Sequence, residues 1–522
     1  MDEGVLFNNN KPKTEGDGTP PETPTQPMAG EVPVAESASQ TPNGETPVQS
    51  EAPVSEAQVP VASASVDPSV PAEETPQEVT EAVEEPAPQS GFGGNGLLKK
   101  ILIGVGIVLL IGILIFLFLP KQQQAKNVKL TWWGLWEDDR VMQSIISDFE
   151  RENPNIQVEY IKQVPKQYRD RLLTRMENGT GPDIFRFHNS WLPMMQKVLT
   201  PLAAETITPS DFQKTYYPVM QKDLVSNGAI YGIPLGTDSL ALFVNTELLK
   251  SAGVEPPRDW DEFLKAARKL TVKDENDEIE TSGAGLGTAG NVTHFPDILS
   301  VLFAQQGVDI EDLPNSVDAE IDSLEFYTGF ANGQQNTWNG TLDDSLIAFS
   351  RGELAMYFGY SWDVFAIRTL NKSLPFTIYA MPALYGKNMT VASYWAEGVS
   401  SQSPNKKEAL LFMKHLVKKE TAQKFYEAAA KERGFGEPPA RKDLAESIQD
   451  EPLVAPFVNQ MDNATSSYFM SDTYDGDTGM NSVLNNYLRD AVNAIVIDHT
   501  SEDTAVGKLN TAISQILKKY EL

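Results

Sequence analysis

The chain has 522 residues, a net charge of −30, four histidines and no cysteine. The absence of cysteine excludes disulfides, thiol nucleophiles, cysteine-based metal sites and a lipid-modified cysteine anchor. At the usual size of about 100 to 200 residues per domain, the length suggests two or three folded units in addition to any unfolded segment.

An acidic segment occupies residues 1–98. It holds 17 aspartates and glutamates against two lysines and no arginine, so this fifth of the chain carries half of the net charge. It is rich in proline, threonine, serine, glutamine and valine, and Phe7 and Phe92 are its only aromatic residues. Such a composition cannot bury enough apolar surface to offset the entropy of ordering. We therefore predict a disordered, proline-rich tail.

A long apolar run follows at residues 101–119, where all 19 positions are apolar or glycine. A helix of this length spans close to the ~30 Å hydrocarbon core of a bilayer. A secretory signal peptide is the alternative, but its apolar core is normally about 7 to 15 residues and ends in small residues. We predict an uncleaved transmembrane anchor at 99–120 and a linker at 121–127. Lysines flank the run on both sides and do not settle its orientation.

Strand-like and helix-like patterns alternate after the linker. The stretches 127–136, 155–164 and 182–187 read as strands, and the stretches 140–154 and 168–181 between them have apolar residues at helical spacing. This order predicts an α/β fold with a parallel sheet. The alternation restarts with a strand-rich stretch at 228–245, and the chain is almost wholly helical from Lys406 onward. About 400 residues is long for one core, so we expect two lobes.

Enzyme signatures are missing from the sequence. It contains no G-x-S-x-G, no H-E-x-x-H and no phosphate-binding G-x-x-x-x-G-K-[ST] motif. The histidines lie far apart without the spacing of metal ligands. We expect no enzyme activity, no metal and no cofactor.

One glycine-rich stretch and one acidic stretch partly match known ligand-binding motifs. "GLGTAG" at 285–290 satisfies G-x-G-x-x-G, but no buried strand precedes it, which disfavours a dinucleotide site. "SDTYDGDTG" at 471–479 lacks the register of a calcium loop, so we interpret it as a solvated loop.

Aromatic and polar side chains recur where the expected strands end. In open α/β sheets ligands bind beyond strand ends or between domains, and aromatic rings offer apolar faces on which sugar C–H groups stack. The alternative for each ring is an ordinary core position. For the tryptophans of "LTWWGLW" we favour core for Trp132 and a binding cleft for Trp136, leaving Trp133 open, with a membrane-interface belt as the alternative. The set comprises Trp133, Trp136, Glu137, Phe187, His188, Asn189, Trp191, Asp238, Tyr360, Trp362, Tyr394, Trp395 and Glu397.

Four blocks of sequence resemble one family. They are "GPDIFRFHNSW" at 181–191, "GAIYGIPLGTDSLALFVNTELLKSAGVEPPRDWDEFLKAARKLT" at 228–271, "AFSRGELAMYFGYSW" at 348–362 and "SPNKKEALLFMKHL" at 403–416. From about residue 128 to the C-terminus the chain resembles the extracellular solute-binding proteins of sugar ABC importers, similar to maltodextrin-binding protein. The resemblance implies a two-lobed periplasmic-binding-protein type II fold, closing about a hinge whose first crossing lies near residues 236–242. We expect lobe 1 at about 128–237 and 375–425, and lobe 2 at about 242–360 and 430–522.

The resemblance also places residues at the cleft between the lobes. It implies ligand-binding positions at Trp136, Glu137, Phe187, His188, Asn189, Trp191, Asp238, Asn291, His294, Tyr360 and Trp362. Tyr394, Trp395 and Glu397 occupy a loop where the family has small residues, so this departure would tailor the pocket. A second departure is the acidic tail and anchor in place of a cleaved lipoprotein signal.

The function implied is that of a membrane-anchored extracellular protein that captures a carbohydrate and delivers it to ABC permease subunits. The family's location would put the N-terminus in the cytoplasm and the lobes outside. A sugar or peptide sensor or adhesion module without a transport role is the alternative, and no nucleic-acid partner is expected.

Overall fold

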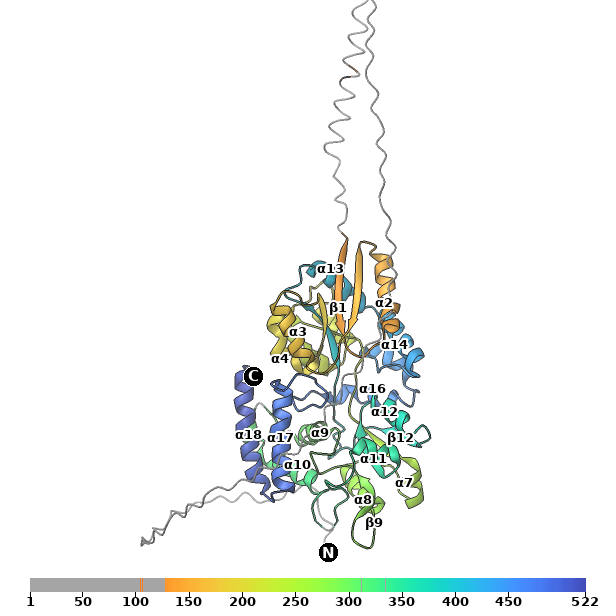
Figure 1. Ribbon diagram of the computed structural model, residues 1–522, viewed down its shortest axis with the longest axis vertical. Coiled ribbons are helices and arrows are strands. Elements are labelled where there is room, and N and C mark those ends of the chain that lie inside the picture. Colours follow the sequence, from red (N-terminus) through yellow and green to blue (C-terminus); the bar gives the residue numbers. More distant parts are fainter. Residues whose placement is uncertain (1–103, 105, 107–126, 311, 334) are drawn as a thin grey trace, which may run out of the picture. The chain divides into compact units, whose positions relative to one another are not determined.

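The computed structural model describes residues 127–310, 312–333 and 335–522, and ahead of them only residues 104 and 106 (Figure 1). The expected tail and anchor therefore lie almost entirely outside the described residues. Among the helices of the described part, none combines the length and the apolar composition needed to cross a membrane.

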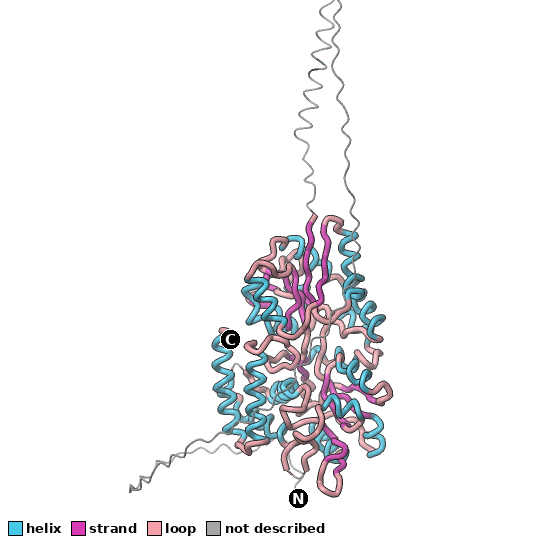
Figure 2. The backbone as a smooth tube through the Cα atoms, viewed as in Figure 1, coloured by secondary structure: helices cyan, strands magenta, loops and turns pink. Residues whose placement is uncertain are grey.

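The first lobe is built on a six-stranded sheet in the order β2-β1-β3-β14-β4, with β7 also paired to β14. β1 runs parallel to both β2 and β3, as the alternation of strands and helices predicts, whereas β14 is antiparallel to β3. The magenta strands β1 and β2 lie side by side in Figure 2. The strands are β1 (Val128–Gly134), β2 (Ile156–Lys162), β3 (Ile184–His188), β4 (Leu199–Thr200), β7 (Ile233–Pro234) and β14 (Trp395–Ser400).

Helices cover this sheet. The first of them shows why the sequence folds this way: the Asp138 side chain accepts a hydrogen bond from Arg140 N at 3.0 Å and caps α2, whose apolar stripe at Val141, Ile145 and Phe149 is buried. The helices of this lobe are α2 (Asp139–Glu152), α3 (Tyr168–Glu177), α4 (Leu192–Met195), α5 (Pro209–Thr215), α6 (Pro218–Leu224), α13 (Lys406–Leu416) and α14 (Lys419–Arg433), with a 3-10 turn η1 (Asn189–Trp191) and the short strands β5 (Val225–Ser226) and β6 (Ala229–Ile230).

The second lobe is built on a five-stranded mixed sheet in the order β12-β8-β11-β10-β9. Gly287, after β10, has a φ of +111°, and a Cβ atom there would lie 2.6 Å from Ala331 N, so the "GLGTAG" stretch needs glycine for close backbone packing. The strands are β8 (Ala241–Asn245), β9 (Val272–Lys273), β10 (Ile279–Ala284), β11 (Leu354–Gly359) and β12 (Phe376–Tyr379).

The helices of the second lobe include a C-terminal antiparallel pair, α17 and α18, seen at one side in Figure 1. Each buries an apolar stripe that contributes to the core of this lobe. The helices are α7 (Thr246–Ala252), α8 (Trp260–Leu270), α9 (Phe295–Gln306), α10 (Val317–Thr328), α11 (Ser345–Arg351), α12 (Asp363–Leu370), α17 (Met480–Val496) and α18 (Glu502–Lys519).

Each lobe has its own large hydrophobic core, one around each sheet. The two-lobed α/β fold is thereby confirmed. The lobe boundaries differ from the expected ones: β12 pairs with β8 in the second sheet although residues 375–425 were expected in the first lobe, and Ala440 and Met461 lie in the first core although 430–522 was expected in the second.

Three chain segments connect the cores and lie side by side. The first passes between Leu235 of the first core and Leu240 of the second, which overlaps the expected crossing at 236–242. Leu240 N donates to Val391 O at 3.0 Å, and Ala392 N donates to Thr465 O at 2.9 Å. The short strands β13 (Thr390–Val391) and β15 (Ala464–Thr465) form the second and third connections, and the short helices α15 (Lys442–Ala445) and α16 (Ala455–Val458) precede β15. A narrow connection of this kind is typical of a hinge.

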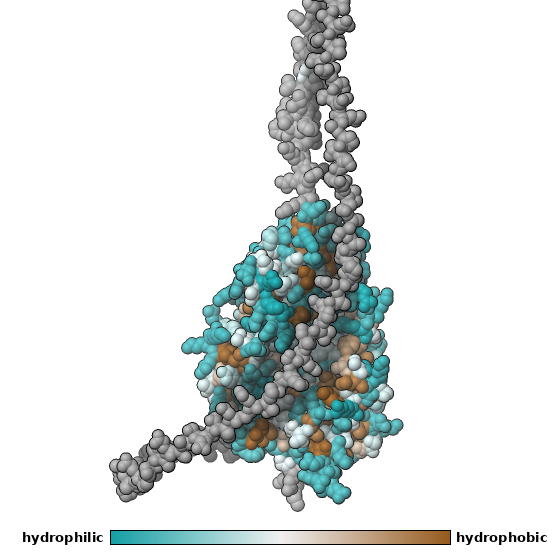
Figure 3. Space-filling model, in the orientation of Figure 1, coloured by the Kyte–Doolittle hydropathy of each residue, from teal (hydrophilic) through white to brown (hydrophobic). Residues whose placement is uncertain are grey.

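The visible surface in Figure 3 is largely hydrophilic, with hydrophobic side chains dispersed among polar ones. The exposed large hydrophobic residues come from separate elements, as Val164, Leu370 and Ile497 illustrate. Scattered apolar residues of this kind are ordinary on a protein surface.

Candidate functional site

Four rings of the predicted set gather in the first lobe. Trp136 follows β1, His188 ends β3, and Trp395 begins β14 opposite His188 in the sheet register. The Trp395 ring lies edge-on to three others, with centroid distances of 5.1 Å to His188, 5.3 Å to Trp191 and 5.9 Å to Trp136. Trp136 and Trp395 are half-buried, whereas Trp191 is fully buried. The open members of this aromatic cluster are therefore Trp136 and Trp395.

Three more predicted residues meet in the second lobe. Tyr360 and Trp362, which follow β11, stack with centroids 4.2 Å apart and planes 15° from parallel. His294, just before α9, lies edge-on to Tyr360 at 5.1 Å. Trp362 is half-buried, and the other two side chains are buried. Trp362 is thus the ring of this group that a ligand could reach.

The segment 471–475 joins the two groups of rings. The Tyr474 ring lies 5.4 Å from the Trp136 ring, while Ser471 Oγ is 2.8 Å and Asp472 Oδ2 is 3.8 Å from His294 Nδ1. Asp472 and Tyr474 both have positive φ values, 54° and 51°, a backbone region that residues with side chains rarely adopt. The expected solvated loop is therefore held between the lobes, and Asp472 and Tyr474 are candidates that the sequence did not reveal. An aromatic ring inside an acidic loop was the only sequence signal for them.

His294 carries the clearest electrostatic shift in the second lobe. Burial lowers its pKa, but the Asp363 carboxylate 2.9 Å from Nε2 outweighs this effect and raises the pKa to about 9. The imidazolium is therefore the form at neutral pH, and its charge lies beside the stacked Tyr360 and Trp362 rings.

Glu137 and Glu397 lie inside the first lobe and bind one buried arginine. Arg186 donates to both carboxylates, with 2.7 Å between its Nε and Glu397 Oε1, and Trp132 Nε1 donates to Glu397 Oε2 at 2.6 Å. Burial raises the pKa of both carboxyl groups, but the Arg186 charge outweighs it at Glu137, whose pKa is lowered, and only reduces the rise at Glu397. Trp132 is fully buried, as expected for a core residue, and Trp133 is half-buried.

Phe187, His188 and Asn189 are buried at the end of β3. Phe187 packs so closely on Gly232 that a Cβ atom there would lie 2.8 Å from its ring. His188 is held by Ser190 Oγ at 2.7 Å and Ser393 Oγ at 3.1 Å, and burial lowers its pKa to about 3, so its ring is neutral.

Asn189 and Tyr394 share one acceptor, Asp223. Asn189 Nδ2 and the Tyr394 hydroxyl donate to Asp223 Oδ2 at 2.9 and 2.8 Å. Burial raises the pKa of Asp223 to about 6, although these hydrogen bonds lower it. The carboxylate thus fixes two predicted residues at once.

The side chains of Asp238 and Asn291 form hydrogen bonds with backbone groups of other segments. Asp238 Oδ2 accepts from the Ser361 backbone N at 2.9 Å, which ties the first crossing segment to the loop that carries Tyr360 and Trp362. Asn291 Nδ2 donates to Asn339 O and Leu342 O, and its Oδ1 accepts from Trp338 Nε1 at 3.1 Å. Neither side chain lies in either group of rings.

Within the described residues, no group of three or more histidine, aspartate and glutamate side chains is placed to hold a metal ion. The arrangement instead offers half-buried rings from both lobes, with carboxylate and hydroxyl groups between them. Such a surface can bind a polar organic ligand.

A family model described as bacterial extracellular solute-binding protein matches residues 144–456. The chain belongs to this family. Its members bind solutes and are not enzymes, in agreement with the expectation from sequence. The matched stretch ends before the segment 471–475.

Named relatives and solved structures agree with this assignment. The chain is 26% identical over 327 residues to the multiple sugar-binding protein of Streptococcus mutans, covering 59% of this chain and 76% of the relative. MalE from Xanthomonas citri has a similar structure, with a TM-score of 0.61 at 19% identity, covering 75% of this chain and 98% of MalE. A cyclo/maltodextrin-binding protein complexed with maltotetraose gives a TM-score of 0.60 at 18% identity, covering 76% and 99%. At these identities the solved structures establish the fold.

Proposed function

We propose that this protein is a membrane-anchored extracellular binding protein that captures a carbohydrate between its two lobes and delivers it to an ABC-type permease. The observation that carries the proposal is that each lobe presents half-buried rings, Trp136 and Trp395 in the first and Trp362 in the second. Segment 471–475 contacts both groups, through Tyr474 on Trp136 and through Ser471 on His294. Rings that flank a ligand on two sides bind the C–H faces of a sugar. The named relative binds multiple sugars, and solved structures of the same fold hold maltotetraose or mannotriose.

Closure would be driven by the ligand. Because the rings belong to different lobes joined by three narrow segments, a sugar that contacts both sides stabilises the closed arrangement more than the open one. The Asp472 carboxylate and the other polar groups of segment 471–475 supply acceptors for sugar hydroxyls. The proposed site comprises all fourteen predicted residues. Trp136, Trp362 and Trp395 contact the ligand directly, and the buried residues hold the surrounding structure in place.

The binding experiment uses tryptophan fluorescence. Residues 127–522, which contain both cores, are titrated with maltose, maltotetraose, mannotriose and tagatose. We expect saturable binding of at least one sugar, and Trp136→Ala and Trp362→Ala should each weaken it at least tenfold, or about 1.4 kcal/mol. Tyr487→Ala, an exposed ring on α17 away from both groups, is the control. Equal affinity in both tryptophan variants would refute the proposed site.

The anchor is supported by the apolar run at 101–119. The same run, together with the long acidic tail, favours a sensor or adhesion module as a second candidate function. Uptake of the bound sugar by cells distinguishes them: a transport subunit is required for uptake, whereas deletion of a sensor leaves uptake unchanged when the permease is present.

A further inference from the structure

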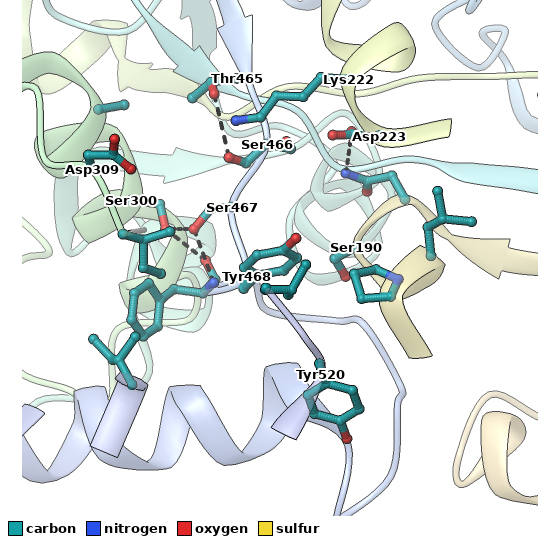
Figure 4. Close-up of a pocket in the computed structure, with 18 of the residues that line it drawn as sticks. Ser190, Lys222, Asp223, Ser300, Asp309, Thr465, Ser466, Ser467, Tyr468 and Tyr520 are labelled. Carbon is teal, nitrogen blue, oxygen red and sulfur yellow. Dashed lines mark hydrogen bonds between the residues drawn. The ribbon is translucent and has the colours of Figure 1, made fainter. Parts of the chain in front are cut away.

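A cavity of about 720 Å³ lies between the lobes, and its walls come from both of them. The first lobe contributes η1, α4 and α6, the second contributes α9 and the end of α18, and the third crossing segment runs past it at residues 465–469. Figure 4 shows Lys222, Asp223 and Ser466 along one side and Tyr520 at the other. Of the open rings described above, Trp136, Trp362, Trp395 and Tyr474, none lines this cavity, so it is separate from them.

The charges of the walls nearly cancel. Three lysines and four acidic residues line the cavity, Lys197, Lys222 and Lys519 against Asp223, Asp309, Glu320 and Glu521. A charged ligand would be attracted by the wall groups of opposite charge and repelled by those of like charge. A neutral ligand with both donors and acceptors can form hydrogen bonds with either kind of group. A purely apolar ligand would displace water from the polar groups of the walls without replacing its hydrogen bonds, which is unfavourable.

The remaining lining is mixed in a way that suits a hydroxylated molecule. Hydroxyl groups come from the run 465–468 and from Tyr520, while Phe303, Leu192 and Ile513 supply apolar surface. Part of the hydroxyl set is already ordered, because Ser300 Oγ donates to Ser467 Oγ at 2.8 Å. A cavity of this volume is in the usual range for small-molecule sites, roughly 300 to 1,000 Å³.

Asp223 connects the cavity to the candidate sugar site. It lines the cavity, is only partly buried there, and accepts hydrogen bonds from Asn189 and Tyr394 with one carboxylate oxygen, Oδ2. Tyr394 immediately precedes Trp395 of the aromatic cluster. A ligand that bonds to the Asp223 carboxylate therefore acts on a group that already positions two residues of the other site.

We propose that this cavity is a second binding site, for a small neutral hydroxylated molecule such as a polyol or a monosaccharide, and that Asp223 is its polar contact in the first lobe. Because the walls of the cavity belong to both lobes, a molecule bound there contacts both lobes without touching the rings of the candidate sugar site.

The test is calorimetric titration of residues 127–522 with sorbitol, glycerol and glucose. Ala304→Trp fills the cavity from α9, and Asp223→Asn changes its polar contact with little change of shape. Ala494→Trp, the same substitution at a half-buried helical alanine of α17 outside the cavity, is the matched control. The double variant Trp136→Ala/Trp362→Ala removes contacts of the candidate sugar site only.

We expect at least one probe to bind the parent protein and the double tryptophan variant with equal affinity. Ala304→Trp should weaken that binding at least tenfold, and Asp223→Asn should weaken it at least threefold, whereas Ala494→Trp should leave it unchanged. Two results overturn the proposal: no saturable binding of any probe, or binding that the double tryptophan variant abolishes and Ala304→Trp leaves intact. If Ala304→Trp does not fold, Asp223→Asn decides alone. Failure of the proposed sugar site is a different result, seen as equal affinity for maltotetraose in the tryptophan variants.

Discussion

Arg186 links two carboxylates in the interior of the first lobe. It is buried between Glu137 and Glu397, and Glu397 in turn accepts from the Trp132 indole of β1. Burial of these three charged groups is tolerated because Arg186 donates to both carboxylates, so removal of the arginine leaves two carboxylates without their partner. The ion pair with Arg186 also fixes the position of Glu137, which immediately follows Trp136, an open ring of the candidate site.

Arg186→Met should lower the free energy of unfolding by about 3 to 5 kcal/mol, because it leaves buried charge uncompensated. Arg140→Met, at an exposed arginine that also forms ion pairs, is the control and should leave the free energy of unfolding almost unchanged, because exposed ion pairs contribute little. Urea denaturation followed by circular dichroism measures both. If Arg186→Met lowers the free energy of unfolding only slightly, the two carboxylates must become protonated or hydrated in the absence of the arginine.

His294 makes stability depend on pH. Its pKa in the folded protein is about 9 against 6.5 in an unfolded chain, so the folded state holds the proton more tightly. The resulting stabilisation is complete below pH 6.5 and is lost as the pH rises from 6.5 to 9, on the order of 3 kcal/mol in total. The free energy of unfolding should fall across this window, and His294→Gln should flatten the fall. An undiminished fall in His294→Gln would show that another group is responsible for it.

At the scale of elements, the N-terminal end of α17 makes one of the contacts between the two lobes. Asn481 Oδ1 accepts from Ser190 Oγ of η1 at 3.0 Å, and Arg169 of α3 donates to Asp475 O at 2.6 Å. The Asp475 carboxylate accepts from the backbone N of Asn481 at 2.7 Å and so caps the helix start. The same segment carries Tyr474 against Trp136.

Asn481→Ala should reduce sugar affinity threefold to tenfold although Asn481 lies in neither group of rings. It removes a contact made only when the lobes meet, worth about 1 kcal/mol, so the closed state becomes harder to reach. Asn486→Ala, at an exposed position on the same helix, is the matched control. Fluorescence titration gives the affinity, and small-angle scattering gives the degree of closure. Unchanged affinity in Asn481→Ala would mean that the contact persists in the open state.

The sequence predicted local elements better than their pairing. The apolar periodicity of α2 and α3 and the strands β1 to β3 could be read directly, because they depend on neighbours a few residues away. The assignment of β12 to the second sheet could not, since its partner β8 lies about 130 residues earlier. For the same reason the contacts of segment 471–475 with Trp136 and His294 left no pattern in the sequence.

The same contrast between local and long-range information applies to the site residues. Placing rings at strand ends brought together Trp136, His188, Trp191 and Trp395, because the ends of neighbouring strands lie at one edge of a sheet. Residue type alone could not separate Glu397, which neutralises a buried arginine, from a carboxylate free to bind ligand. That distinction depends on Arg186, which lies in the middle of β3 between Phe185 and Phe187.

At the scale of the whole molecule, two cores of similar construction are joined by the three crossing segments and by contacts such as that of Ser190 with Asn481. A ligand held by rings of both lobes would couple them, since it binds the folded form of each. We expect the sugar at a concentration of 100 times its Kd to stabilise the protein by about 2.7 kcal/mol. Scanning calorimetry should show both lobes shifting to higher temperature together. A shift confined to one of two separate transitions would show that the ligand contacts a single lobe.

The place of β14 in the first sheet also sets the order in which the chain can fold. This strand lies between β3 and β4, yet it comes about 200 residues after them, once most of the second lobe has been synthesised. Until residue 400 emerges, β3 has an unpaired edge and the Arg186 side chain lacks Glu397. Exposed strand edges recruit other chains, so a chain arrested during secretion before this point is prone to aggregate. The sheet of the first lobe is therefore begun before the second lobe is synthesised and completed only after most of it.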